Sequence, residues 1–108
     1  MTDDPAARLQ VDTSEESGWL VLRLVGDLDP HTAPLLEETI DEHLGSGALA
    51  IDLEKIGFMD SAGLRVLISA QERATERAVE LALRSPSDSA RRVLEITGLT
   101  DHLRIDPS

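Results

Sequence analysis

A serine between an aspartate and a small, glycine-containing turn is the residue best placed for chemistry in this sequence. Ser61 follows Asp60 and precedes Ala62 and Gly63, between an apolar run over 49–53 and an amphipathic run over 64–78. This order puts its hydroxyl where the exit of a strand becomes the first turn of a helix. Loops at the carboxyl ends of strands are where α/β proteins usually meet ligands and partners, so we expect Ser61 to lie at such an exposed edge.

A nucleophilic role for Ser61 needs a general base and an oxyanion hole. The nucleophile elbow has the form G-x-S-x-G, and residues 59–63 match only its last glycine. Of the three histidines, His43 is expected on a helix face and His102 in a surface turn, which leaves only His31, in the neighbouring loop. Because loop-borne serine and histidine often coincide without forming a site, the sequence predicts that the protein is not an enzyme.

Three aspartates are expected near Ser61 at the strand ends, namely Asp27, Asp29 and Asp60. Together they could hold a hard cation such as Mg²⁺, but the D-x-D-x-D-G spacing of an EF-hand is absent. Capping of helices and turns is the commoner use of such residues, and we favour it here. The glycines at 45 and 47 precede a strand and have no lysine after them, unlike a phosphate-binding loop. We expect neither a metal nor a cofactor.

Covalent phosphorylation suits the position of Ser61 better than a role as a nucleophile, in a metal site or in a phosphate-binding loop. The free N–H groups and the dipole at a helix N-terminus favour the added charge of about −1.5 to −2, so the fold should survive phosphorylation. In an interface the same dianion must be desolvated or met by cations, and nearby aspartates would deepen the negative potential. Phosphorylation there can switch binding while sparing stability. The alternative interpretation is an ordinary capping or first-turn serine.

Composition narrows the class of protein. A chain of 108 residues fits one domain with one core. Its net charge of −11 and its two large aromatic residues, Trp19 and Phe58, disfavour a nucleic-acid or membrane-surface partner. No apolar segment reaches the ~20 residues that cross a bilayer, and the first residues lack the pattern of a signal peptide. We therefore expect a cytoplasmic protein. The absence of cysteine does not by itself indicate the cellular compartment.

Hydrophobic periodicity predicts alternating strands and helices. Strands are expected over 9–13, 19–25, 49–53 and 79–83, with a short last strand near Leu103 and Ile105; the first two form an antiparallel hairpin. The segment 26–30 is expected to break the second strand. The first helix is taken as 32–44, closed by Gly45, although Asp29 with Pro30 and Thr32 with Pro34 are both acceptable starts.

The second predicted helix begins in the turn at 60–63 and continues to Ala78. Its inner face is assigned to Leu64, Leu67, Ile68, Gln71, Ala74 and Ala78, while Arg65, Glu72, Arg73, Glu76 and Arg77 face water. A third helix is capped by Ser87 or Asp88 and ends at Gly98, with Leu99 making a hydrophobic contact beyond it.

This order predicts a single α/β domain over 8–106, preceded by a flexible arm over 1–7. The sheet is mixed but mostly parallel, with four to five strands, and three to four helices pack mainly on one of its faces.

The motifs in this order resemble those of a known family. The central stretch is Ile51-Asp52-Leu53 followed by Phe58-Met59-Asp60-Ser61-Ala62-Gly63-Leu64. It is joined by Gly26-Asp27-Leu28-Asp29 with Thr32-Ala33-Pro34, by Ser85-Pro86-Ser87, and by Val93-Leu94-Glu95-Ile96-Thr97-Gly98-Leu99. In order and spacing the set resembles the STAS domain, specifically the stand-alone anti-sigma factor antagonists of bacteria. One departure is Arg77-Ala78, where the family often has two glycines before the fourth strand.

The resemblance implies partner switching in transcription regulation, as in bacterial stress response and sporulation. In that family the unphosphorylated protein binds an anti-sigma factor with serine kinase activity, phosphorylation of the serine of D-S-x-G-L ends the complex, and a protein phosphatase resets it. The matching phosphoacceptor here is Ser61. The residues implied in partner binding are Asp27, Asp29, Thr32, Met59, Asp60, Ala62, Gly63 and Leu64. The alternative is a constitutive STAS subunit of a larger assembly, such as a stressosome or a lipid-transport complex, with Ser61 only a helix cap. The oligomeric state stays open between a monomer and a weak dimer.

Overall fold

The computed structural model describes residues 8–45, 47–98 and 103–106. The elements in chain order are β1 (Leu9–Glu16), β2 (Trp19–Leu28), α2 (Ala33–His43), β3 (Ala48–Met59), α3 (Ser61–Glu76), β4 (Leu81–Arg84), α4 (Asp88–Thr97) and β5 (Ile105–Asp106). The predicted order of elements is confirmed. The predicted arm over 1–7 and the contact of Leu99 fall outside the described residues.

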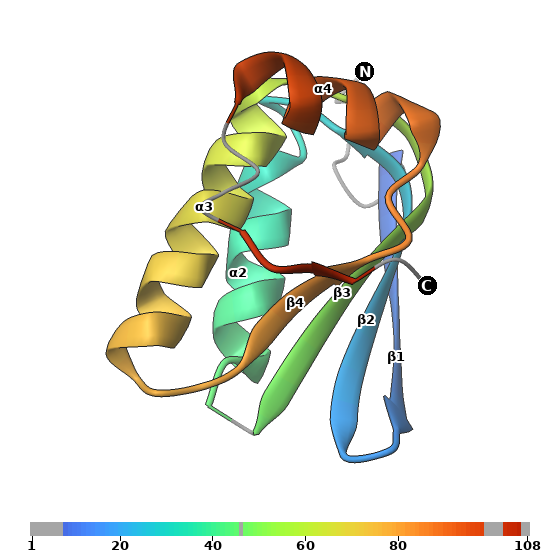
Figure 1. The fold of residues 1–108 in the computed structure, drawn as a ribbon. Helices are drawn as coiled ribbons and strands as arrows, with labels where there is room; N and C mark the ends of the chain where they lie inside the picture. The colour runs from blue at the N-terminus through green and yellow to red at the C-terminus, as the bar shows by residue number, and fades with distance from the viewer. Residues whose placement is uncertain (1–7, 46, 99–102, 107–108) are drawn as a thin grey trace.

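The five strands form one sheet in the order β1-β2-β3-β4-β5. β1 runs antiparallel to β2, and every other neighbouring pair is parallel. The helices α2 and α3 lie side by side on one face of the sheet, and α4 crosses one end of it (Figure 1). The core fills the space between them, with Leu22, Ile51 and Leu67 fully buried. The predicted fold class is confirmed: a mixed, mostly parallel sheet with helices mainly on one face.

The face of the sheet without α2 and α3 carries a row of alternating charge. Direct cross-strand partners along this row are Asp12, Arg23, Asp52, Arg84 and Asp106, one from each strand. One pair of the row, Arg23 Nε and Asp52 Oδ2, lies 3.5 Å apart. Opposite charges directly across neighbouring strands favour the pairing, so the row supports the observed register.

The second strand does not break at Gly26, and the prediction for 26–30 is wrong in this respect. β2 continues to Leu28, with a register shift between Gly26 and Asp27 against β3. Gly26 has a φ of +129°, and a Cβ there would stand 2.0 Å from the carbonyl oxygen of Arg8. A glycine therefore lets the strand pass close to the start of β1, where the sequence pattern indicated only an interruption.

The third strand is more than twice as long as predicted, and two β-bulges explain why. β3 gains one residue over β2 between Arg23 and Val25, and another between Gly26 and Asp27. Its exposed and buried residues then follow a three-residue period, with Leu53, Ile56 and Met59 buried and two exposed residues in each gap. A period-two pattern cannot detect such a segment.

Helix ends and one helix face also differ from the prediction. α3 ends at Glu76, and Ala78 is an exposed residue with a φ of +56°, so it does not belong to the inner face. Arg73 does not face water: its side chain is 21% exposed, and Nη2 lies 2.9 Å from Asp41 Oδ1 on α2. The α2 C-cap is Leu44, with Gly45 following at a φ of +115°.

The caps of α4 follow the sequence. The Ser87 hydroxyl accepts a hydrogen bond from the Ala90 N–H at 3.2 Å, and Gly98 ends the helix in the left-handed conformation. Near its start, α4 also covers the part of β3 that β4 does not reach. The Ser87 N–H donates to the Leu53 carbonyl at 3.1 Å, and the Ser89 hydroxyl donates to the Gly57 carbonyl at 2.9 Å.

Candidate functional site

The turn between β3 and α3 presents Ser61 to solvent. Asp60 is the N-cap of α3, and its Oδ1 accepts a hydrogen bond from the Ala62 N–H at 2.8 Å. Ser61 is the first residue of the helix and is exposed. Within the part of the chain that the structure describes, its hydroxyl has no hydrogen-bond partner. The capping role thus belongs to Asp60, as expected for that aspartate, and the Ser61 hydroxyl is left available.

Close backbone packing fixes this turn against the end of β2. The Asp60 N–H donates to the Leu28 carbonyl at 3.0 Å, which extends the β2–β3 ladder by one bond. Gly63 is buried, and a Cβ there would stand 2.7 Å from the Leu28 Cβ and 3.4 Å from the Met59 Cγ. The glycine of the D-S-x-G-L motif therefore lets the first turn of α3 lie directly on the sheet.

The neighbouring turn, between β2 and α2, is organised by Asp29. Its Oδ1 accepts hydrogen bonds from the N–H groups of His31, at 2.9 Å, and Thr32, at 3.0 Å. Thr32 is the N-cap residue of α2 and is fully buried; its hydroxyl donates to the Asp27 carbonyl at 2.8 Å and accepts from the Asp29 N–H at 3.0 Å. The expected capping role of Asp29 is confirmed, and Thr32 ties the end of β2 to the start of α2.

Arg8 adds a positive charge to this turn. Its guanidinium forms an ion pair and hydrogen bond with Asp29 and lies 3.7 Å from Asp27 Oδ2. Burial by itself raises the pKa of Asp29, but the N–H groups of Thr32 and His31, together with Arg8, outweigh it and hold the pKa below its usual value. Asp29 is therefore ionised at neutral pH in spite of its burial.

The phosphoacceptor and the eight residues that the family resemblance implies in partner binding divide by exposure. Ser61 is exposed, and Asp27, Asp60 and Ala62 are partly exposed. The other five, Asp29, Thr32, Met59, Gly63 and Leu64, are buried. The structure brings all nine together at the carboxyl end of the sheet, where the buried set forms the support and the exposed set the surface.

Sequence reasoning missed two residues at this edge. Arg8 was assigned no role, although an arginine near the start of an edge strand with two nearby aspartates is a usable signal. Phe58 enters the sequence analysis as one of two large aromatic residues and as part of a motif, without a binding role, yet 49% of it is exposed. The bulges described above put it there, and no single-residue signal in the sequence reveals them.

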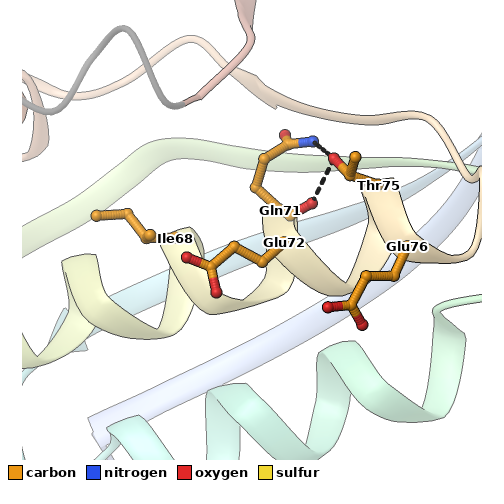
Figure 2. Close-up of a pocket in the computed structure, with 5 residues that line it drawn as sticks. All are labelled: Ile68, Gln71, Glu72, Thr75 and Glu76. Carbon is orange, nitrogen blue, oxygen red and sulfur yellow. Dashed lines mark hydrogen bonds between the residues drawn. The ribbon is translucent and has the colours of Figure 1, made fainter.

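Three surface depressions among the described residues have linings that do not include Ser61. A shallow depression of ≈ 370 Å³ lies farther along α3, where Figure 2 shows its lining: Ile68, Gln71, Glu72, Thr75 and Glu76. In the same described ranges, no group of histidine, cysteine, aspartate and glutamate side chains could hold a metal ion. No helix there has the length and apolar character to cross a membrane. The geometry at Ser61 is that of an exposed hydroxyl on the first residue of a helix.

Comparison with known families decides where the chain belongs. The family model of the STAS domain matches residues 10–108, which is nearly the whole sequence. The chain is a STAS domain. This STAS domain is 38% identical over 84 residues to the anti-sigma-B factor antagonist of Listeria monocytogenes, an alignment that covers 76% of this chain and 74% of the relative.

Solved structures agree on the fold. A crystal structure of an anti-sigma factor antagonist from Mycobacterium paratuberculosis matches with a TM-score of 0.82 at 26% identity, covering 93% of this chain and 86% of the other. The Bacillus cell fate determinant SpoIIAA in its phosphorylated form matches with a TM-score of 0.66 at 22% identity, covering 93% and 92%. The second likeness, below 25% identity, is one of fold.

Proposed function

We propose that this STAS domain is an anti-sigma factor antagonist whose binding is switched off by phosphorylation of Ser61. The observation that carries the proposal is the exposed Ser61 hydroxyl, without a hydrogen-bond partner among the described residues, in a turn whose capping is done by Asp60. The partner is an anti-sigma factor with serine kinase activity, and a protein phosphatase restores the unphosphorylated form. The relatives named as anti-sigma factor antagonists support this assignment.

The geometry lets a phosphate act on binding and not on folding. Ser61 is outside the core, so the added group displaces no packed side chain, and its charge lies at the favourable end of the α3 dipole. In a complex, the same dianion would be enclosed near the carboxylates of Asp27 and Asp60. Like charges brought together in a desolvated interface cost several kcal/mol, on the order of 2–5, which is enough to release a partner.

The alternative, a constitutive assembly subunit with Ser61 only a cap, requires Ser61 to serve the helix. Asp60 fills that role, and the Ser61 hydroxyl makes no bond to the α3 backbone in the described structure. The phosphorylation switch is therefore the function that the site supports best.

The test uses the purified chain, ATP and the serine-kinase anti-sigma factor encoded nearest to its gene. We expect phosphate on Ser61 by mass spectrometry and none on Ser61→Ala. In binding titrations Ser61→Ala should match the wild type, and Ser61→Asp should bind at least tenfold more weakly because of its charge.

Ser61→Asn is the matched control, since it has the size of Ser61→Asp without the charge. We expect it to bind within about threefold of the wild type. If Ser61→Asp binds this anti-sigma factor as tightly as the wild type, the proposed switch is wrong.

A further inference from the structure

Two of the three large apolar residues exposed in the described structure lie at the edge that carries Ser61. They are Val25, 37% exposed, and Phe58, 49% exposed; the third is Ile96, 76% exposed, on α4. Phe58 is the direct cross-strand partner of Asp27, and Val25 precedes Asp27 by two positions on β2. Residues two apart on a strand point to the same face, so the two apolar side chains flank the Asp27 carboxylate.

A β-bulge is the cause of the exposure of Phe58. β3 places two residues, Gly57 and Phe58, against the single step from Gly26 to Asp27 on β2. From the buried Ile56, regular alternation would turn Phe58 inward and Met59 outward, whereas the structure has Phe58 exposed and Met59 only 3% exposed. Bulges commonly re-aim a side chain next to a functional site. The hydrogen bond from the Ser89 hydroxyl to the Gly57 carbonyl supports this bulge.

Phe58 lies close enough to Ser61 for one partner to cover both. Three residues span at most about 10 Å between Cα atoms. A standard interface buries about 800 Å² on each partner, which corresponds to a disc of about 16 Å radius. A kinase whose interface of this size is centred on the Ser61 hydroxyl therefore reaches Phe58.

We propose that Phe58, together with Val25, is the apolar anchor through which the anti-sigma factor docks on this domain, beside the ion pair of Asp27 with Arg8. This inference rests on the proposed function. The occupant follows from the position and chemistry of the surface: Phe58 lies three residues from the serine that the kinase must reach, and its exposed ring needs an apolar partner face. A complementary face offers an apolar pocket that receives Phe58, with polar groups at its rim. Aromatic residues in such pockets dominate the binding energy of an interface.

The experiment compares Phe58→Ala with Ile96→Ala, which removes an exposed apolar side chain from a different element. Binding of each to the serine-kinase anti-sigma factor encoded nearest to the gene is measured by calorimetry. We expect Phe58→Ala to bind on the order of 10- to 50-fold more weakly, and Ile96→Ala to stay within twofold of the wild type. In the phosphorylation reaction, Phe58→Ala should raise KM for the antagonist and leave kcat within about twofold.

Thermal melts and circular dichroism establish that each variant is folded, and Phe58→Leu, which keeps most of the apolar surface, should bind more tightly than Phe58→Ala. If the wild type binds and is phosphorylated while Phe58→Ala binds within twofold of it, the anchor is wrong and the proposed function stands. If the wild type binds none of the serine-kinase anti-sigma factors of its own genome, both the function and the anchor fail.

Discussion

The close approach of α3 to the sheet at Gly63 can be tested by adding one methyl group. In Gly63→Ala the new Cβ would stand 2.7 Å from the Leu28 Cβ and 3.3 Å from the Leu28 carbonyl oxygen, so the helix start or β2 must move. Overpacking of this kind costs about 1–3 kcal/mol. Replacing glycine by alanine inside a helix by itself stabilises the fold by about 0.5–1 kcal/mol. The packing cost should win, with a net loss of roughly 1–2 kcal/mol in the free energy of unfolding.

Urea and thermal unfolding measure this loss, which corresponds to a melting temperature lower by roughly 5–15 °C in a domain of this size. Gly57→Ala is the matched control, because its Cβ would meet only the Asp27 Oδ1, at an ordinary 3.6 Å. We expect the control to stay within about 0.5 kcal/mol of the wild type. A Gly63→Ala protein as stable as the wild type, or more stable, would mean that helix propensity decides and that the close approach does not constrain the turn.

Two further predictions concern the caps. The ionised Asp29 has a lowered pKa in the folded state, so its contribution to stability is present above about pH 4 and is lost as the pH falls through the folded pKa. Asp29→Asn should cost about 1–3 kcal/mol at pH 7 and show a smaller drop in stability than the wild type from about pH 5 to about pH 3, measured by urea titration; an equal drop would contradict the role of Asp29. Asp60→Ala removes the N-cap side chain of α3 and should lower the free energy of unfolding by about 1 kcal/mol. Ser61→Ala should change it by less than about 0.5 kcal/mol. Equal losses in the two melts would show that capping is not the work of Asp60 alone.

The order of the elements could be predicted because local patterns determine it. The first hairpin, the capping of α4 by Ser87 and Gly98, and the turn at Asp60 all depend on residues that are neighbours in the sequence. The same holds for Asp29, whose hydrogen bonds reach only two and three residues ahead.

The rest of the structure depends on contacts between distant segments. At position 26 only a residue without a Cβ fits beside the backbone of Arg8. Arg73 is half-buried because it forms an ion pair with Asp41 on α2. The long β3 depends on two bulges that change the period of burial from two residues to three. The exposure of Phe58 depends on the second of these bulges, so the local pattern of residues does not reveal it.

The row of alternating charges on the open face of the sheet has a consequence for association between molecules. It contains an odd number of members, one from each strand, and so it begins and ends with the same sign: Asp12 on β1 and Asp106 on β5. Two copies joined edge to edge at this row, whichever edges they used, would set one aspartate beside another. Like charges directly opposite disfavour strand pairing. The pattern that supports the order of strands within one domain therefore also discourages the sheet from growing into its neighbour.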